Sequence, residues 1–112
     1  MPPPISLGTL TILSGQANSE ALDFRAATRA QNIKALTIYA PGTLPEGIHV
    51  EVRPPGGAWR RLQSGGADVA VTVGDATVLD TVTYSELRVS TDTGTVAADR
   101  VFDLEGREES RW

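Results

Sequence analysis

One side chain in this sequence has the chemistry of a base near neutral pH. It is His49, the single histidine, and Glu51 follows on the same face of an alternating apolar–polar segment. A nucleophile activated by this histidine would be a serine or threonine from a distant part of the chain, and no spacing indicates one. We therefore predict a solvent-facing histidine on a strand rather than a catalytic base.

Metal and paired-carboxylate chemistry have equally few candidates. The chain has no cysteine, which excludes disulfides, thiol nucleophiles and thiolate metal sites. The run Asp92-Thr93-Gly94 with Asp99 is only a fragment of a calcium loop, which needs about six or more oxygen ligands. Acid pairs such as Asp103 with Glu105 lack the aromatic walls of a sugar cleft. The sequence predicts no enzyme, no cofactor and no metal.

Length and charge narrow the class of protein further. A chain of 112 residues is expected to form one domain with its own core. Its net charge is −4, and the basic residues of the first half are too few for a nucleic-acid footprint. No run approaches the roughly 18 apolar residues of a membrane span, and Met1-Pro2-Pro3-Pro4 is not a signal peptide. We expect neither nucleic acid nor membrane as a partner.

Alternating apolar residues between turn residues predict an all-β fold of eight or nine short strands. We expect an antiparallel β-sandwich of jelly-roll or immunoglobulin-like type. The segment 5–13 is apolar on both faces, which indicates a strand covered on both sides for part of its length. Strand 76–79 is expected to pair back on 68–73, where Val69, Val71 and Val73 point inward. The expected strands are 5–13, 19–24, 33–40, 48–53, 58–62, 68–73, 76–79, 84–90 and 96–104.

The clearest unit is the hairpin 47–62, in which Pro54-Pro55-Gly56-Gly57 makes the turn. Trp59 lies just past this turn, where an aromatic side chain commonly covers the edge of a small core. Core packing is the favoured interpretation, and an exposed platform that stacks on a sugar ring is the alternative.

The two ends of the chain are candidate docking arms. Residues 1–4 read as an extended arm, residues 5–104 as the folded domain and residues 105–112 (EGREESRW) as a charged tail. Arginine and tryptophan are enriched at interface hot spots. The tentative interaction residues are Pro2, Pro3, Pro4, Trp59, Arg60, Arg61, Arg107, Arg111 and Trp112.

Four segments carry a resemblance to a known class of proteins. They are ALTIYAPGTLPEGIHVEV, PPGGAWRRLQSGG, VAVTVGDATVLDTVTYSELRVSTDTG and AADRVFDLEG, and the resemblance covers about residues 33–104. This succession resembles small virion proteins of tailed bacteriophages, of the capsid decoration (cement) type. The resemblance implies a protein made in the host cytoplasm that binds the outer capsid surface. Its implied partners are the major capsid protein and other copies of itself, and the matching docking arms are Pro2–Pro4 and Arg107–Trp112.

Two other functions remain open alongside this one. Both ends would also suit a head–tail or tail component. A carbohydrate-binding module or adhesin would use Trp59 and Tyr84 as its platform. Acids concentrate in residues 68–112, and this asymmetry would favour head-to-tail contacts between copies if the two halves of the chain form separate surfaces.

Overall fold

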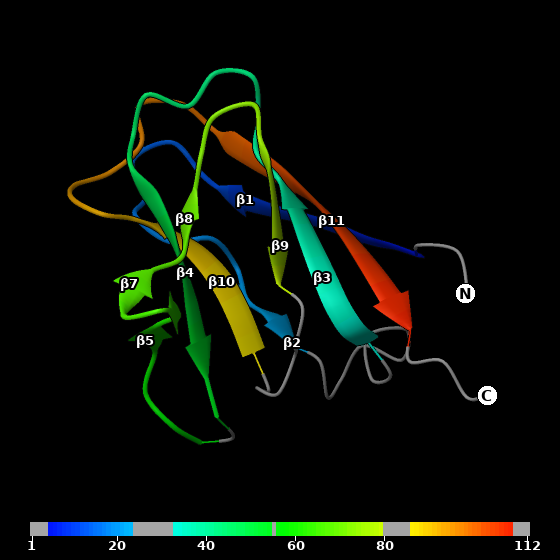
Figure 1. The fold of residues 1–112 in the computed structure, drawn as a ribbon. Coiled ribbons are helices and arrows are strands. Elements are labelled where there is room, and N and C mark those ends of the chain that lie inside the picture. The colour runs from blue at the N-terminus through cyan, green and yellow to red at the C-terminus, as the bar shows by residue number, and fades with distance from the viewer. Residues whose placement is uncertain (1–4, 24–32, 55, 80–85, 109–112) are drawn as a thin grey trace.

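β-Strands are the only regular elements in the described part of the chain (Figure 1). The computed structural model describes residues 5–23, 33–54, 56–79 and 86–108. The all-β prediction is therefore confirmed for these residues. The strands are β1 (Ile5–Ile12), β2 (Leu22–Asp23), β3 (Ile33–Tyr39), β4 (Ile48–Arg53), β5 (Arg60–Arg61), β6 (Gln63–Ser64), β7 (Ala67–Asp68), β8 (Ala70–Val71), β9 (Ala76–Leu79), β10 (Glu86–Thr91) and β11 (Arg100–Glu108).

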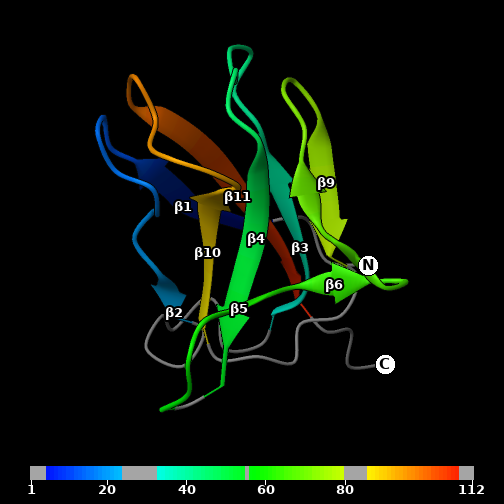
Figure 2. The ribbon, with the colours of Figure 1, turned by 90° about the vertical axis from the view of Figure 1, so that its left-hand side faces the viewer.

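The main strands form two antiparallel sheets. The first sheet has the order β1-β11-β3-β9 and the second the order β2-β10-β4-β5, with β8 also paired to β4. In Figure 1 the second sheet lies to the left of the first. In Figure 2 the molecule is turned by 90°, so that the second sheet lies in front of the first. β10 and β11 come from the acidic half of the chain but lie between strands of the other half. The two halves therefore do not form separate surfaces, and the premise for head-to-tail contacts is wrong.

One apolar core receives side chains from both sheets. Alternation along each strand turns every second residue inward, as the sequence pattern predicted. Each sheet thereby buries one face. The inward residues with almost no exposure are Leu10, Ile12, Leu36, Ile38, Phe102 and Leu104 from the first sheet, and Ile48, Val50, Leu87 and Val89 from the second.

A β-bulge explains the imperfect alternation of the first strand. The register of β1 against β11 shifts between Ser6 and Gly8, and Gly8 has a φ of 89°. The extra residue turns Leu7 toward the core, while Leu13 at the other end is 56% exposed. Coverage of this strand on both sides was a wrong prediction, because the bulge changes which residues face inward.

The turn at residues 72–75 carries the chain from one sheet to the other. Val71 in β8 is buried and β8 pairs with β4, whereas β9 pairs with β3. The predicted pairing of 76–79 with 68–73 is therefore wrong. Val73 lies in the turn and is 44% exposed, because a reversal does not keep the alternation of a strand.

β11 begins and ends later than the sequence predicted. Val96 is buried in a loop, and the strand continues through 105–108, which the sequence analysis assigned to the tail. The charges did not prevent pairing because Leu104 and Gly106 face inward while Glu105 faces outward. β11 also has a neighbour on each side, β1 and β3, to satisfy its backbone.

Some predictions fall outside the described residues. These are the arm 1–4, the end of the 19–24 strand beyond Asp23, the start of the 84–90 strand, and residues 109–112 of the tail. Among the residues that are described, no helix is long and apolar enough to cross a membrane.

Candidate functional site

The outward face of the second sheet gathers ionisable side chains from two neighbouring strands. Alternation turns the odd-numbered residues of β4 outward on one side and the even-numbered residues of β10 outward beside them. Residues directly opposite in an antiparallel pair lie close enough to interact. The opposed pairs are His49 with Ser90, Glu51 with Arg88, and Arg53 with Glu86.

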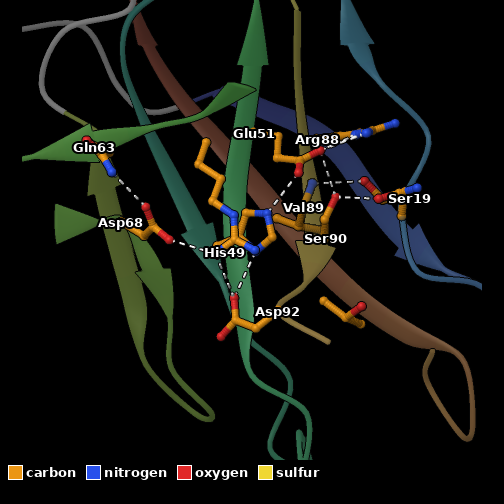
Figure 3. A network of polar contacts seen from close by, with 12 residues as sticks. Ser19, His49, Glu51, Gln63, Asp68, Arg88, Val89, Ser90 and Asp92 are labelled. Carbon is orange, nitrogen blue, oxygen red and sulfur yellow. Dashed lines mark hydrogen bonds and ion pairs between the residues drawn. The ribbon is translucent and has the colours of Figure 1, made fainter. Parts of the chain in front are cut away.

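His49 lies at the centre of this face and is only 2% exposed. Its Nδ1 is 2.8 Å from Oδ1 of Asp92, and its Nε2 is 2.9 Å from Oε2 of Glu51 (Figure 3). A neutral imidazole has one N–H, so it can donate to only one of two carboxylates. The ring is held at both nitrogens by carboxylates from two segments, Glu51 on β4 and Asp92 in the loop after β10. The prediction of a solvent-facing histidine is wrong, because Asp92 and the strands on both sides enclose it.

Gly47 makes room for the Asp92 contact. The Asp92 backbone N–H donates to the Gly47 carbonyl at 2.8 Å, which brings the two segments together. A Cβ placed on Gly47 would lie 2.5 Å from Oδ2 of Asp92. The absent side chain at position 47 thus lets the Asp92 carboxylate reach the His49 ring.

Glu51 joins the histidine to the neighbouring strand. Its Oε1 accepts from Arg88 Nε at 2.7 Å and from Ser90 Oγ at 3.2 Å. Burial alone would raise the pKa of Glu51, but the hydrogen bonds from His49, Arg88 and Ser90 outweigh it and leave that pKa below its ordinary value. Ser90 Oγ also lies 2.7 Å from Oδ1 of Asn18, which ties the segment before β2 to the same face.

Trp59 packs against two arginines on this face. The guanidinium carbons of Arg53 and Arg88 lie 4.6 Å and 4.4 Å from the ring centroid. These distances are typical of cation–π contacts. Arg53 also makes a two-point ion pair with Glu86, at 2.8 Å and 3.0 Å. The ring is half-buried and is not part of the apolar core, so the core packing predicted for Trp59 is wrong.

Arg61 extends the network toward the β6–β7 hairpin. Its Nη1 is 2.7 Å from Oδ2 of Asp68, whose other oxygen accepts from Gln63. The hydrogen bonds from Arg61 and Gln63 hold the pKa of Asp68 below its ordinary value. Arg61 Nη1 also lies 4.0 Å from Oδ1 of Asp92.

We call these linked side chains the polar network. It contains four acids and four basic side chains, and each acid lies within 4.0 Å of at least one of the basic side chains. The acids are Glu51, Asp68, Glu86 and Asp92, and the bases are His49, Arg53, Arg61 and Arg88.

A second ion pair lies apart from the network at the start of β11. Arg100 is 9% exposed and donates to both carboxylate oxygens of Glu46, at 2.9 Å and 3.1 Å. This two-point contact holds the pKa of Glu46 below its ordinary value. The pair joins the loop before β4 in the second sheet to a central strand of the first.

The structure brings only part of the predicted interaction set together. Trp59 and Arg61 belong to the polar network. Arg60 is exposed on β5 opposite Val52, and Arg107 is exposed on β11 in the first sheet, away from the network. The predicted residues that lie outside the described part of the chain are Pro2, Pro3, Pro4, Arg111 and Trp112, together with Tyr84 of the alternative platform.

Sequence reasoning missed Glu51 and Asp92 as partners of the histidine, and Arg88 as a partner of Glu51. Glu51 was visible as a same-face neighbour of His49. Pairing β4 with β10 in register would have added Arg88. Nothing in the sequence pattern indicated that Asp92 reaches His49, because that contact depends on a loop conformation.

The network joins β4, β5 and β10 to the Asp92 loop and the β6–β7 hairpin through contacts between side chains of the chain itself. Both ring nitrogens of its one potential base already contact carboxylates of the chain. Within the described residues, no group of three or more His, Asp or Glu side chains is arranged to hold a metal ion. In comparisons with known proteins, no family model, curated protein or solved structure matches the chain.

Proposed function

We propose that the chain is a non-enzymatic structural protein of a tailed-phage virion, which binds the outer surface of the capsid and stabilises it. The observation that carries this proposal is the polar network. Its charged groups contact one another, and His49 has no nitrogen left to accept a proton from a substrate. Such a face rigidifies a domain that acts by binding.

The segments that resemble decoration proteins support the same proposal. They contain β10 and most of β3, β4 and β11, which are the inner strands of the two sheets. The resemblance therefore falls on the framework of the fold and not on a peripheral loop. We further propose that the two sheets form a β-sandwich of the jelly-roll or immunoglobulin-like type that the sequence predicted, because both bury one face in a common core.

Many bound copies would stabilise a shell, because each copy buries surface against the shell subunits and these contributions add. Each bound copy that spans a junction between shell subunits must be released, or must lose contacts, before the subunits separate. A rigid domain loses little conformational freedom when it binds, so more of its contact energy remains as affinity.

Co-sedimentation of the purified full chain with empty capsid shells from its own source tests the proposal. We expect saturable binding and a higher melting temperature of the decorated shells. The docking arms are tested by deleting Pro2–Pro4 and, separately, 109–112. The second deletion begins at Glu109 because Arg107 and Glu108 are paired residues of β11. Trp112→Ala tests the terminal aromatic side chain by itself, and Ser110→Ala is its control. Absence of binding by the unmodified chain would contradict the proposed function.

The carbohydrate-binding alternative is weakened by the surroundings of Trp59. A sugar ring that stacks on the indole would compete with the guanidinium groups of Arg53 and Arg88. We therefore place glycan binding second. In a Trp112→Phe background only Trp59 is left to report, and quenching of its fluorescence by a glycan would support the carbohydrate-binding function. A head–tail or tail component remains the alternative if capsid shells are not bound but tails are.

A further inference from the structure

The outward face of the first sheet carries an exposed apolar stripe. Four of the five large apolar side chains that are exposed in the described residues belong to it. Each lies on, or just after, a different strand of this sheet, and together they follow its strand order β1-β11-β3-β9. They are Leu13 just after β1, Val101 in β11, Tyr39 in β3 and Val78 in β9.

The strand registers place these residues diagonally across the sheet. Val101 is opposite Thr11, two residues before Leu13. Tyr39 is opposite Asp103, two residues after Val101. On its other side Tyr39 is opposite Ala76 of β9, which lies two residues before Val78. Diagonal neighbours on one face are about 7–8 Å apart, so the four residues form one diagonal row, the stripe, across strands that span about 14 Å from β1 to β9.

Acidic side chains flank the stripe. Asp103 lies directly opposite Tyr39, is exposed, and makes no hydrogen bond or ion pair within the described residues. Glu105 lies on the same face and accepts from the Tyr39 hydroxyl at 3.0 Å. Asp75 precedes β9 and Asp99 precedes β11, both exposed at the rim, while Arg107 is the one exposed arginine that the described residues place on this face.

We propose that this face, which we call the stripe face, is the docking surface for a basic protein surface in which Lys or Arg side chains surround aliphatic ones. The inference rests on the proposed function and deepens it by naming the chemistry of the shell surface that is bound. The aliphatic part of that surface covers the stripe. Its cations lie against Asp103 and the neighbouring acids, which steer the approach.

Charge complementarity selects this occupant over a second copy of the chain. In a two-fold symmetric contact the stripe faces of two copies would oppose each other. Each face carries more acids than arginines, so two such faces would repel each other on balance. The outward face of the second sheet is less suited to this partner, because its acids already contact arginines of the chain.

Binding of stripe-face variants to the empty capsid shells tests the inference. Val78→Thr with Val101→Thr removes apolar surface but keeps β-branched residues on the strands. Val73→Thr is the matched control, since Val73 is 44% exposed but lies in the turn between the sheets. Asp103→Asn removes one negative charge, and Thr93→Lys makes the same change in net charge on an exposed turn. Urea unfolding confirms that each variant is folded.

We expect the double valine variant to weaken shell binding about tenfold. Asp103→Asn should weaken it several-fold and reduce its dependence on salt, whereas both controls should bind like the unmodified chain. If the unmodified chain binds shells and the stripe-face variants bind equally well, the stripe face is overturned and the proposed function stands. If the unmodified chain does not bind shells, the proposed function and the docking role of the stripe face are both wrong. Self-association of the chain in sedimentation velocity that the valine variant abolishes would assign the face to a second copy and overturn the inference.

Discussion

Replacing Gly47 with alanine tests how Asp92 is held against His49. The new Cβ would lie 2.5 Å from Oδ2 of Asp92, so the carboxylate has to move away from the ring. The Nδ1 contact that would be lost is 2.8 Å long, and the Asp92 side chain is 49% exposed. A hydrogen bond to a charged group contributes about 1.5–3 kcal/mol, and partial exposure favours the lower end, about 1.5 kcal/mol.

A second effect of Gly47→Ala has the opposite sign. Gly47 does not have a positive φ, so alanine fits the backbone and stabilises the fold by about 0.4–1 kcal/mol through the unfolded chain. In the unmodified protein the net change should be a destabilisation of about 1 kcal/mol. In an Asp92→Ala background the clash is gone, and the same substitution should stabilise.

Chemical unfolding of the four proteins in this cycle measures the coupling between positions 47 and 92. We expect a coupling of about 1.5 kcal/mol, or about 6 °C in melting temperature for a 112-residue chain. Equal destabilisation by Gly47→Ala in both backgrounds would refute the reasoning, because the cost would then not pass through the Asp92 carboxylate.

Three further predictions concern the charges, the core and the end of the fold. In the folded protein the pKa values of Glu46 and Glu51 are lowered, so these groups take up protons at a higher pH in the unfolded chain than in the folded one. The free energy of unfolding should therefore fall as the pH drops below about 4.3. Glu46→Gln should make this loss shallower when unfolding by urea is measured over the same pH range. Phe102 is fully buried, and Phe102→Ala should cost about 3–5 kcal/mol of unfolding free energy; a cost below about 1 kcal/mol would contradict its place in the core. Deleting 109–112 should leave cooperative unfolding intact, whereas deleting 105–112 should abolish it, since the last four residues of β11 are removed; equal melting curves would disprove this role of the strand end.

The inward faces of β4 and β10, and of β3 from Ala35 onward, were predictable from the sequence. In these stretches the alternation is uninterrupted, and one face of each sheet is buried, so a single register fits. The alternation failed where the backbone departs from a regular strand. The bulge at Gly8 and the turn at Val73 each changed the direction of nearby side chains, and neither is visible in a list of apolar positions.

The polar network was the least predictable part of the molecule. A histidine among polar neighbours has the same local pattern whether it faces water or a loop. Burial of His49 depends on Asp92, 43 positions away in the chain. The interpretation of Trp59 failed for a related reason, since the arginines that pack on its ring lie on two different strands.

The position of β11 has a consequence for how the chain reaches its fold during synthesis. β11 follows every other described strand in chain order, yet it is an inner strand of the first sheet, between β1 and β3. Until it leaves the ribosome, β1 and β3 have no common partner, and each presents an unpaired strand edge to its surroundings. The first sheet can therefore be completed only after all the other described strands have been made, by insertion of β11 between β1 and β3. In this interval the nascent chain is open to pairing with other chains, and the cell must protect it from aggregation.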